Sequence, residues 1–165
     1  MQQTSISDTA ISKDYTVLTG DLNGYGFMHG GRLLMLADET GFLAANHFCD
    51  RDCLTVAVHQ ARFHRPAYQN EHLILQARVA FTGKTSLWVP VSILAAHDRL
   101  IMEAVVVYTA VDAQRSPVKV PAVTAHNAAE HQLQADIICL RNFIRSCHDG
   151  IQTTANIKRT HAGQQ

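Results

Sequence analysis

The amino-acid sequence predicts an α+β domain in which one long helix lies across an antiparallel sheet. Apolar residues between Arg32 and Phe48 recur with a helical period, and after Cys53 the period changes to two, as in half-buried strands. Connections of about four residues join the later segments, and such short links force neighbouring strands to run antiparallel. A chain of 165 residues, 47% hydrophobic and 17% charged, has the length and composition of one globular domain.

The predicted helix follows a segment with little regular structure. Residues 1–13 are polar and are expected to be loose, and residues 15–18 form a short strand. Residues 20–31 are dense in glycine, which excludes regular structure there. The helix is about 25 Å long at 1.5 Å per residue, enough to cross a sheet. One broad face of it carries Leu33, Leu34, Ala37, Gly41, Ala44 and Ala45.

Four strands are predicted after the helix, arranged as a meander. They span Leu54–Phe63, Leu73–Phe81, Leu87–Ala95 and Ile101–Val111. Pro90 fits its strand badly, because proline lacks the N–H group that a strand ladder uses. We therefore expect a bulge or an edge position at Pro90.

The core is expected to end at Pro117 and Pro121. The predicted organisation is a loose segment over 1–13, one domain over 14–123, a helical extension over 124–148 and a polar tail over 149–165. Leu133, Ile137, Leu140 and Ile144 are spaced by four or three residues, which indicates a helix in the extension.

Composition and motifs argue against several classes of protein. Equal numbers of acidic and basic residues, 14 of each, leave no global field for nucleic acid. The N-terminus lacks the pattern of a secretory signal, and no apolar run approaches the roughly 20 residues of a membrane helix. We therefore expect a cytoplasmic protein that binds neither nucleic acid nor membrane. Its four cysteines are expected to be reduced thiols, since they are too few for a disulfide framework.

Standard catalytic and metal signatures are not found in the sequence. It contains no Gly-x-Ser-x-Gly elbow of serine hydrolases. Gly83-Lys84-Thr85 resembles the end of a phosphate loop, but Arg78 occupies the position of the required glycine. The histidines and cysteines lack the paired spacing of a metal site, so no metal is predicted.

Two features of the helix are candidates for chemistry. Asp38 lies four residues from both Leu34 and Phe42, within the apolar flank, where a carboxylate loses solvation and needs a partner or a function. Gly30 and Gly31 leave backbone N–H groups uncovered at the positive end of the helix, where a carbonyl oxygen can approach. Asp38 can equally be a solvated residue at the edge of the apolar face, and the glycine pair a plain tight turn.

A set of short motifs resembles the acyl-CoA hydrolase branch of the hot-dog fold thioesterases. The motifs are Asn23-x-x-Gly26-x-x-His29-Gly30-Gly31, Asp38-Glu39, Phe63-x-Arg65-Pro66, Gly83-Lys84-Thr85-Ser86 and Val120-Pro121. Each motif is weak alone, but their order and spacing are specific over residues 15–123. Asn70-Glu71 replaces the Gly-Asp of many relatives, within a predicted turn.

The resemblance implies a long central helix wrapped by an antiparallel sheet, assembled as dimers and then as trimers of dimers. It also implies hydrolysis of acyl-CoA, with no cofactor apart from the coenzyme A of the substrate. Asn23 and Asp38 match two catalytic positions that face each other from different subunits. His29, Gly30 and Gly31 match the oxyanion and substrate-binding segment.

We further predict that four polar residues contact coenzyme A: Arg65, Lys84, Thr85 and Ser86. The alternative for these four is a solvated turn.

Two alternative functions remain open. A hot-dog hydratase carries a histidine a few residues after its aspartate, whereas His47 is nine residues after Asp38. A non-catalytic acyl-CoA binding protein has the same fold, and the sequence does not separate it from an enzyme.

Overall fold

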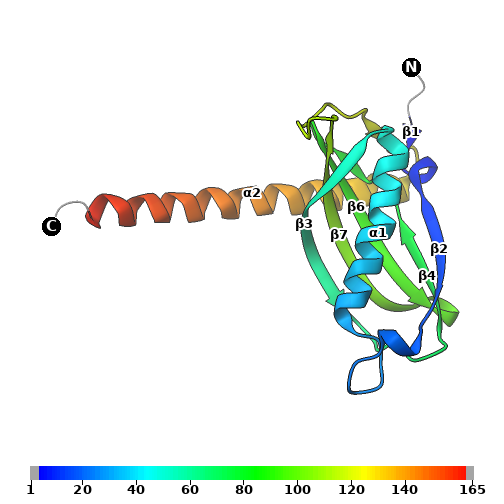
Figure 1. The fold of residues 1–165 in the computed structure, drawn as a ribbon. Coiled ribbons are helices and arrows are strands. Elements are labelled where there is room, and N and C mark those ends of the chain that lie inside the picture. Colours follow the sequence, from blue (N-terminus) through cyan, green and yellow to red (C-terminus); the bar gives the residue numbers. More distant parts are fainter. Residues whose placement is uncertain (1–3, 163–165) are drawn as a thin grey trace.

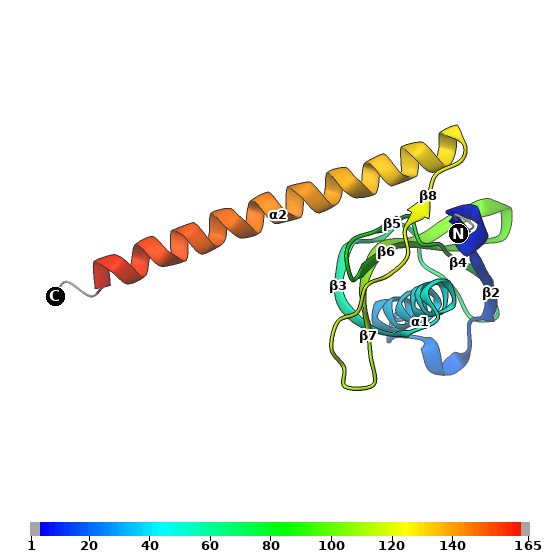
Figure 2. The same cartoon turned by 90° about the horizontal axis from the view of Figure 1, so that it is seen from above.

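A curved sheet wraps around one long helix in the computed structural model, which describes the backbone of residues 4–162 and the side chains of residues 4–147 (Figures 1 and 2). The helices are α1 (Gly30–Cys49) and α2 (Ala128–Ala162). The strands are β1 (Thr4–Ser5), β2 (Ile11–Thr16), β3 (Asp52–Phe63), β4 (His72–Ala77), β5 (Phe81–Thr82), β6 (Ser86–Ala95), β7 (Arg99–Val111) and β8 (Val123–Thr124). The prediction of an α+β fold with one helix across an antiparallel sheet is therefore confirmed.

The main sheet has the order β2-β4-β6-β7-β3, and every neighbouring pair in it is antiparallel. The predicted meander is correct for β4, β6 and β7. It is wrong for β3, which pairs with β7 at the far edge and not with β4. Residues 64–71 connect β3 to β4, and this link is long enough to cross from one edge of the sheet toward the other.

Helix α1 packs on the concave face of the sheet, as Figure 2 shows in a view along its axis. Its buried residues are Leu33, Leu36, Ala37, Thr40, Gly41, Ala44, Ala45 and Cys49. Small residues in the second half of this face let the helix lie close to β6 and β7. The helix begins two residues before the predicted start, capped by His29, and ends at Cys49, where the left-handed conformation of Asp50 stops it.

The N-terminal prediction was wrong for residues 4–13. These residues form β1, a turn of 3-10 helix over Ser7–Thr9 and the first half of β2, so the first long strand begins earlier than residues 15–18. Sequence polarity was misleading here because β2 is an edge strand and most of its side chains are exposed.

The strand predicted over Leu73–Phe81 ends at Ala77. The alternation of buried and exposed residues breaks there, because Val79 and Ala80 are both fully buried. The N–H of Val79 donates a hydrogen bond to the hydroxyl of Thr9 and not to the backbone of a neighbouring strand.

Pro90 was expected at a bulge or an edge, yet it lies in the central strand β6 opposite Val105, with no register shift at that pair. The ladder between β4 and β6 ends at the pair Ala77–Val91, and beyond it the carbonyl of Pro90 accepts a bond from the N–H of Arg78. The missing N–H of Pro90 therefore falls where β4 has already ended.

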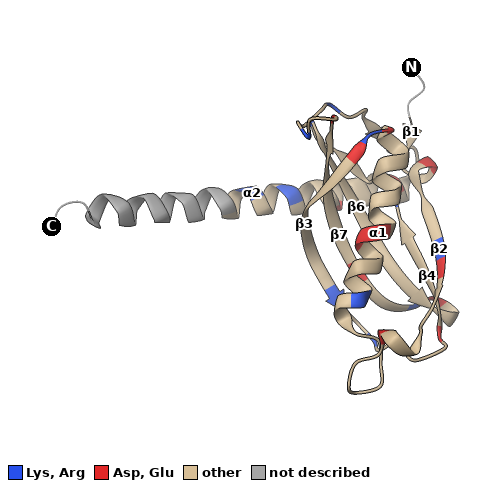
Figure 3. Cartoon of the chain, in the orientation of Figure 1, with Lys and Arg blue, Asp and Glu red and all other residues tan. Residues whose placement is uncertain are grey.

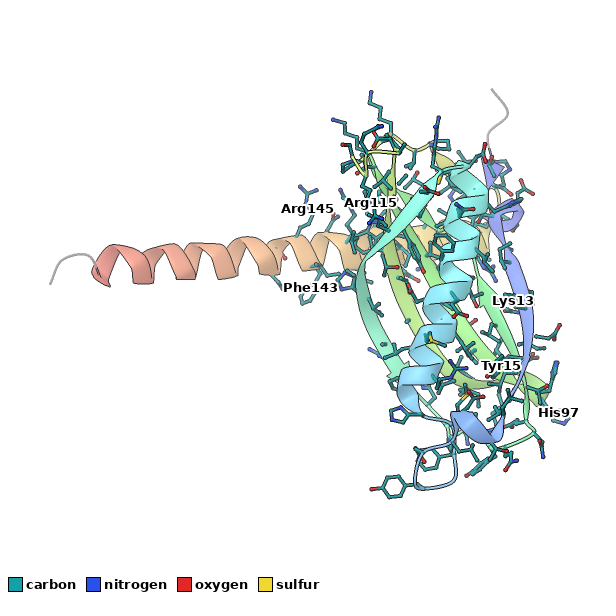
Figure 4. All side chains as sticks on the ribbon, in the orientation of Figure 1. Lys13, Tyr15, His97, Arg115, Phe143 and Arg145 are labelled. Atoms are coloured by element: carbon teal, nitrogen blue, oxygen red, sulfur yellow. The ribbon has the colours of Figure 1, made fainter. Side chains whose placement is uncertain are left out.

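Helix α2 is longer than the predicted extension over 124–148. Its stripe of Leu133, Ile137, Leu140 and Ile144 packs on the outer face of the sheet against Trp88, Val105 and Val107. The helix then leaves the body of the domain (Figure 1), and Figure 4 shows Phe143 and Arg145 near the point of departure. Of the tail predicted over 149–165, residues 149–162 continue α2 and residues 163–165 lie outside the described chain. None of the helices in the described part of the chain is long and apolar enough to cross a membrane.

Candidate active site

Asp38 lies halfway along α1, in the acidic segment that Figure 3 shows there. One of its carboxylate oxygens, Oδ1, accepts a hydrogen bond from the hydroxyl of Thr55 at 2.8 Å and lies 3.2 Å from the hydroxyl of Tyr108. The second oxygen, Oδ2, has no hydrogen-bond donor among the described residues. The structure therefore fixes the orientation of the carboxylate and leaves one oxygen free for a reaction.

Tyr108 supports Asp38 from inside the core. Its side chain is fully buried, and its hydroxyl also donates to the backbone carbonyl of Asp38 at 2.7 Å. Burial, followed by the nearby Asp38 carboxylate, raises the pKa of Tyr108 far above its ordinary value. Tyr108 therefore stays protonated and acts as a permanent donor.

Gly41 makes room for this contact. A Cβ atom at position 41 would lie 2.5 Å from the hydroxyl oxygen of Tyr108, closer than any real Cβ contact. Glycine inside a helix costs about 1 kcal/mol relative to alanine. A side chain at this position would displace Tyr108 from Asp38, so the glycine is required by packing.

A cavity of about 330 Å³ opens beside Asp38. Its lining consists of Lys13, Asp38, Glu39, Phe42, Leu43 and Thr55. Phe42 and Leu43 give this cavity an apolar wall, which suits an acyl chain. Lys13 comes from β2, where Figure 4 shows it beside the helix.

The glycine-dense loop before α1 holds Asn23 in a defined orientation. The side-chain oxygen of Asn23 accepts hydrogen bonds from the backbone N–H groups of Tyr25 at 2.9 Å and Phe27 at 3.5 Å. Its amide nitrogen has no acceptor among the described residues. The loop therefore uses the oxygen of Asn23 and presents its NH₂ group as a donor.

Asp21 anchors the base of this loop, and the sequence analysis missed it. Its buried carboxylate accepts hydrogen bonds from the hydroxyl of Tyr15 at 2.6 Å, the N–H of Leu18 at 2.9 Å and the guanidinium of Arg32 at 2.8 Å. Burial raises the pKa of Asp21, but these hydrogen bonds outweigh burial and hold the pKa below its ordinary value. The backbone carbonyl of Asp21 also accepts from the N–H of His29 at 2.8 Å, which closes the loop.

The start of α1 presents one free donor rather than two. His29 caps the helix, and its Nδ1 accepts the N–H of Gly31 at 3.1 Å. The N–H of Gly30 has no acceptor among the described residues. It borders a cavity of about 290 Å³ whose lining is Phe27, Met28, Gly30, Leu33, Phe63, His64, Arg65 and Pro66.

The predicted coenzyme A contacts lie at opposite ends of the sheet. Arg65 follows β3 beside the start of β7, where its N–H lies near the carbonyl of Ile101, whereas Ser86 pairs with Thr109 near the end of β7. The stretch from Ile101 to Thr109 spans about 26 Å at 3.3 Å per residue. One chain therefore does not bring Arg65 together with Lys84, Thr85 and Ser86.

Asp38 and the loop that holds Asn23 also lie toward opposite ends of the sheet. The Asp38 cavity lies over Thr55, which pairs with Tyr108 toward the Ser86 end of the sheet. The Gly30 cavity lies at the Phe63 end, and Gly30 is about 12 Å from Asp38 along the helix axis. Each chain thus holds its candidate residues in two separate groups, one with the carboxylate and one with the amide donors, and we call these groups half-sites.

The described residues contain no group of three or more histidine, cysteine, aspartate or glutamate side chains that would hold a metal ion.

The chain is similar to proteins of one family. The thioesterase superfamily model matches residues 25–102. An uncharacterized acyl-CoA thioester hydrolase of Zymomonas mobilis is 31% identical over 110 residues, covering 63% of this chain and 73% of the relative. The uncharacterized acyl-CoA thioester hydrolase YkhA of Bacillus subtilis is 24% identical over 154 residues, covering 90% of each chain.

Solved structures show the same fold over almost the whole chain. An apo-hexameric acyl-CoA thioesterase superimposes with a TM-score of 0.85 at 24% identity, covering 90% of this chain and 98% of the other. An acyl-CoA hydrolase of Staphylococcus aureus, solved with butyryl coenzyme A and coenzyme A, gives 0.82 at 23% identity and covers both chains completely.

Proposed function

This chain belongs to the thioesterase superfamily with a hot-dog fold, and from that premise we propose that it hydrolyses acyl-CoA to a free fatty acid and coenzyme A. The observation that carries the proposal is the Asp38 carboxylate. It is held by Thr55 and Tyr108 with one oxygen free, beside a cavity with an apolar wall. Its chemistry uses no cofactor apart from the coenzyme A of the substrate.

The free oxygen of Asp38 supplies the base or the nucleophile. It either accepts a proton from a water molecule that attacks the thioester carbonyl, or attacks that carbon itself to form an anhydride that water then cleaves. Coenzyme A leaves as a thiolate, and a thiol pKa of about 8.5 makes this leaving group good without a strong general acid. The absence of a histidine from this mechanism is therefore chemically reasonable.

Asn23 and the start of α1 supply the donors for the developing oxyanion. The NH₂ group of Asn23 and the N–H of Gly30 are both free to bond to the carbonyl oxygen of the thioester. Donors of this kind contribute on the order of 3 kcal/mol each in other hydrolases. His29 takes the N–H of Gly31 and holds the helix start in place.

A second subunit completes the site in this proposal. Strand β3 is an open edge of the sheet, and its exposed apolar side chains include Leu54, Val56 and Val58. Two copies related by a two-fold axis can pair their β3 strands only in antiparallel fashion. Antiparallel pairing places the Thr55 end of one strand beside the Phe63 end of its copy, and the two half-sites then meet.

The same pairing brings the proposed coenzyme A contacts together. Lys84, Thr85 and Ser86 share the Asp38 end of one subunit, and Arg65 shares the Asn23 end of the other. We propose that the homodimer binds one acyl-CoA at each of two composite sites, and that three dimers form a hexamer. The hexamers named among the structural relatives support this assembly.

Relatives support the choice of residues as well. The Staphylococcus aureus hydrolase has been solved with alanine in place of an asparagine, an aspartate and a threonine. Along that chain these positions are separated as Asn23, Asp38 and Thr55 are here. Thr55 is therefore a candidate site residue, although sequence reasoning did not select it.

The test is release of coenzyme A from a panel of short, medium and long acyl-CoAs, compared with the Asp38→Asn variant. We expect turnover by the native protein and a loss of more than about 100-fold in kcat for the variant, with substrate binding retained. Native protein that binds the acyl-CoAs without turnover would favour the binding-protein alternative. In a single turnover in ¹⁸O-labelled water, label found in the Asp38 carboxylate marks an anhydride that water cleaves at the aspartyl carbon, whereas a general base leaves the label in the fatty acid alone.

A further inference from the structure

Two buried cysteines lie side by side where α1 ends and β3 begins. The sulfur atoms of Cys49 and Cys53 are 3.5 Å apart and share a hydrogen bond. Cys49 is the last residue of α1 and Cys53 the second residue of β3, joined by a tight turn in which Asp50 has a φ of 48°. The proposed acyl-CoA chemistry uses neither thiol.

The surroundings of the pair make the two thiols unequal. Both sulfur atoms also lie near the backbone carbonyl of Arg51, and both side chains belong to the main core at 9% and 6% exposure. The hydrogen bond from Cys53 outweighs burial and lowers the pKa of Cys49 to about 7, whereas the same bond raises the pKa of Cys53. The thiolate form is the nucleophile in thiol chemistry, so Cys49 is the more reactive of the two.

We propose that Cys49 and Cys53 form an oxidation site, at which a peroxide converts the two thiols to an intramolecular disulfide. A disulfide needs a sulfur separation near 2.05 Å, so the two sulfur atoms must approach by about 1.5 Å. Rotation of the two side chains, with a small adjustment of the turn, brings them together. The other cysteines, Cys139 and Cys147, lie exposed on α2 and have no such neighbour in the part of the chain that the structure describes.

The chemistry balances with one peroxide molecule. The Cys49 thiolate attacks a peroxide oxygen, the O–O bond breaks, and a sulfenic acid forms as hydroxide leaves. The sulfur of Cys53 then attacks the sulfenic sulfur, which forms the S–S bond and releases the second oxygen as water. Two thiols and one hydrogen peroxide thus give one disulfide and two waters, and an added dithiol reverses the oxidation.

Peptide mapping of the folded full-length protein tests this proposal directly. Trypsin cleaves after Arg51, between the two cysteines, as well as after Arg32 and Arg62. The protein is treated with hydrogen peroxide, the peroxide is removed, and free thiols are blocked with N-ethylmaleimide as the protein is unfolded, before digestion. We expect peptides 33–51 and 52–62 to appear as one linked species that a reducing agent separates.

Two variants sharpen the test. The Cys139→Ser/Cys147→Ser double variant is the matched control and should give the same linked species at the same peroxide concentration. In the Cys53→Ser variant the sulfenic acid on Cys49 lacks its partner, so dimedone should label Cys49 at least about fivefold more than in the native protein. Peroxide that oxidises Cys139 and Cys147 while leaving Cys49 and Cys53 as free thiols would overturn the proposal.

Discussion

Replacing Gly41 with alanine tests whether Tyr108 positions the catalytic candidate Asp38. Helix propensity alone predicts that this change stabilises α1 by about 1 kcal/mol. The structure predicts the opposite, because the new methyl group would lie 2.5 Å from the Tyr108 hydroxyl oxygen and 3.2 Å from Cγ2 of Val91. Tyr108 is fully buried, so its ring is surrounded by core side chains and does not turn into solvent.

The size of the effect follows from two contributions. Overpacking a core site costs about 1–3 kcal/mol, and a buried hydroxyl that loses its acceptor costs about 1–3 kcal/mol. After the gain in helix propensity is subtracted, Gly41→Ala is expected to lower the free energy of unfolding by about 3 kcal/mol. Because Asp38 loses its support from Tyr108, kcat should also fall by about tenfold or more.

Urea unfolding and acyl-CoA hydrolysis measure the two effects, with Tyr108→Phe as the matched background. Removing the hydroxyl eliminates the 2.5 Å contact, so Gly41→Ala should destabilise the Tyr108→Phe protein by at least about 1 kcal/mol less than the native protein. A Gly41→Ala protein as stable and as active as the native chain would refute the role assigned to Tyr108.

Three further predictions follow from the site. Thr55→Val removes one donor from the Asp38 carboxylate, so kcat should fall by about tenfold with KM nearly unchanged; an unchanged kcat would remove Thr55 from the site. Asp21→Asn should reduce stability by about 2–3 kcal/mol at pH 7. Because the pKa of Asp21 is lowered in the folded state, the stability difference between the native protein and this variant should shrink as pH falls below the ordinary pKa of 3.8. Urea unfolding at several pH values measures this difference, and a difference that stays constant with pH would contradict the prediction. Lys84→Ala should raise KM for acyl-CoA about fivefold while kcat holds, and equal KM values would indicate a solvated turn.

The main helix and the candidate residue Asp38 on it were predictable because their signals are local. A change of period from helical to two locates α1 and the later strands, and a carboxylate on an apolar flank singles out Asp38 without any contact information. Strand order was less accessible, since the apolar pattern of β3 is compatible with pairing to either β4 or β7.

The partners of Asp38 were not predictable in the same way. Tyr108 lies in an apolar run and reads as an ordinary core residue, and only the fold brings its hydroxyl to a helix 70 positions earlier in the chain. Thr55 is one of several polar residues on an edge strand. Gly41 was the available sign in the sequence that another side chain packs closely against this part of the helix, because a helix interior rarely keeps glycine without such a neighbour.

The central claim is that Asp38 of one subunit acts with Asn23 of another, and complementation measures this most directly. Asn23→Ala and Asp38→Ala proteins, each inactive alone, are mixed under conditions in which native mass spectrometry shows subunit exchange. A mixed dimer then contains one doubly altered site and one intact site, so about a quarter of native activity should return at equal mixing. Verified exchange with no return of activity would contradict a site shared between subunits.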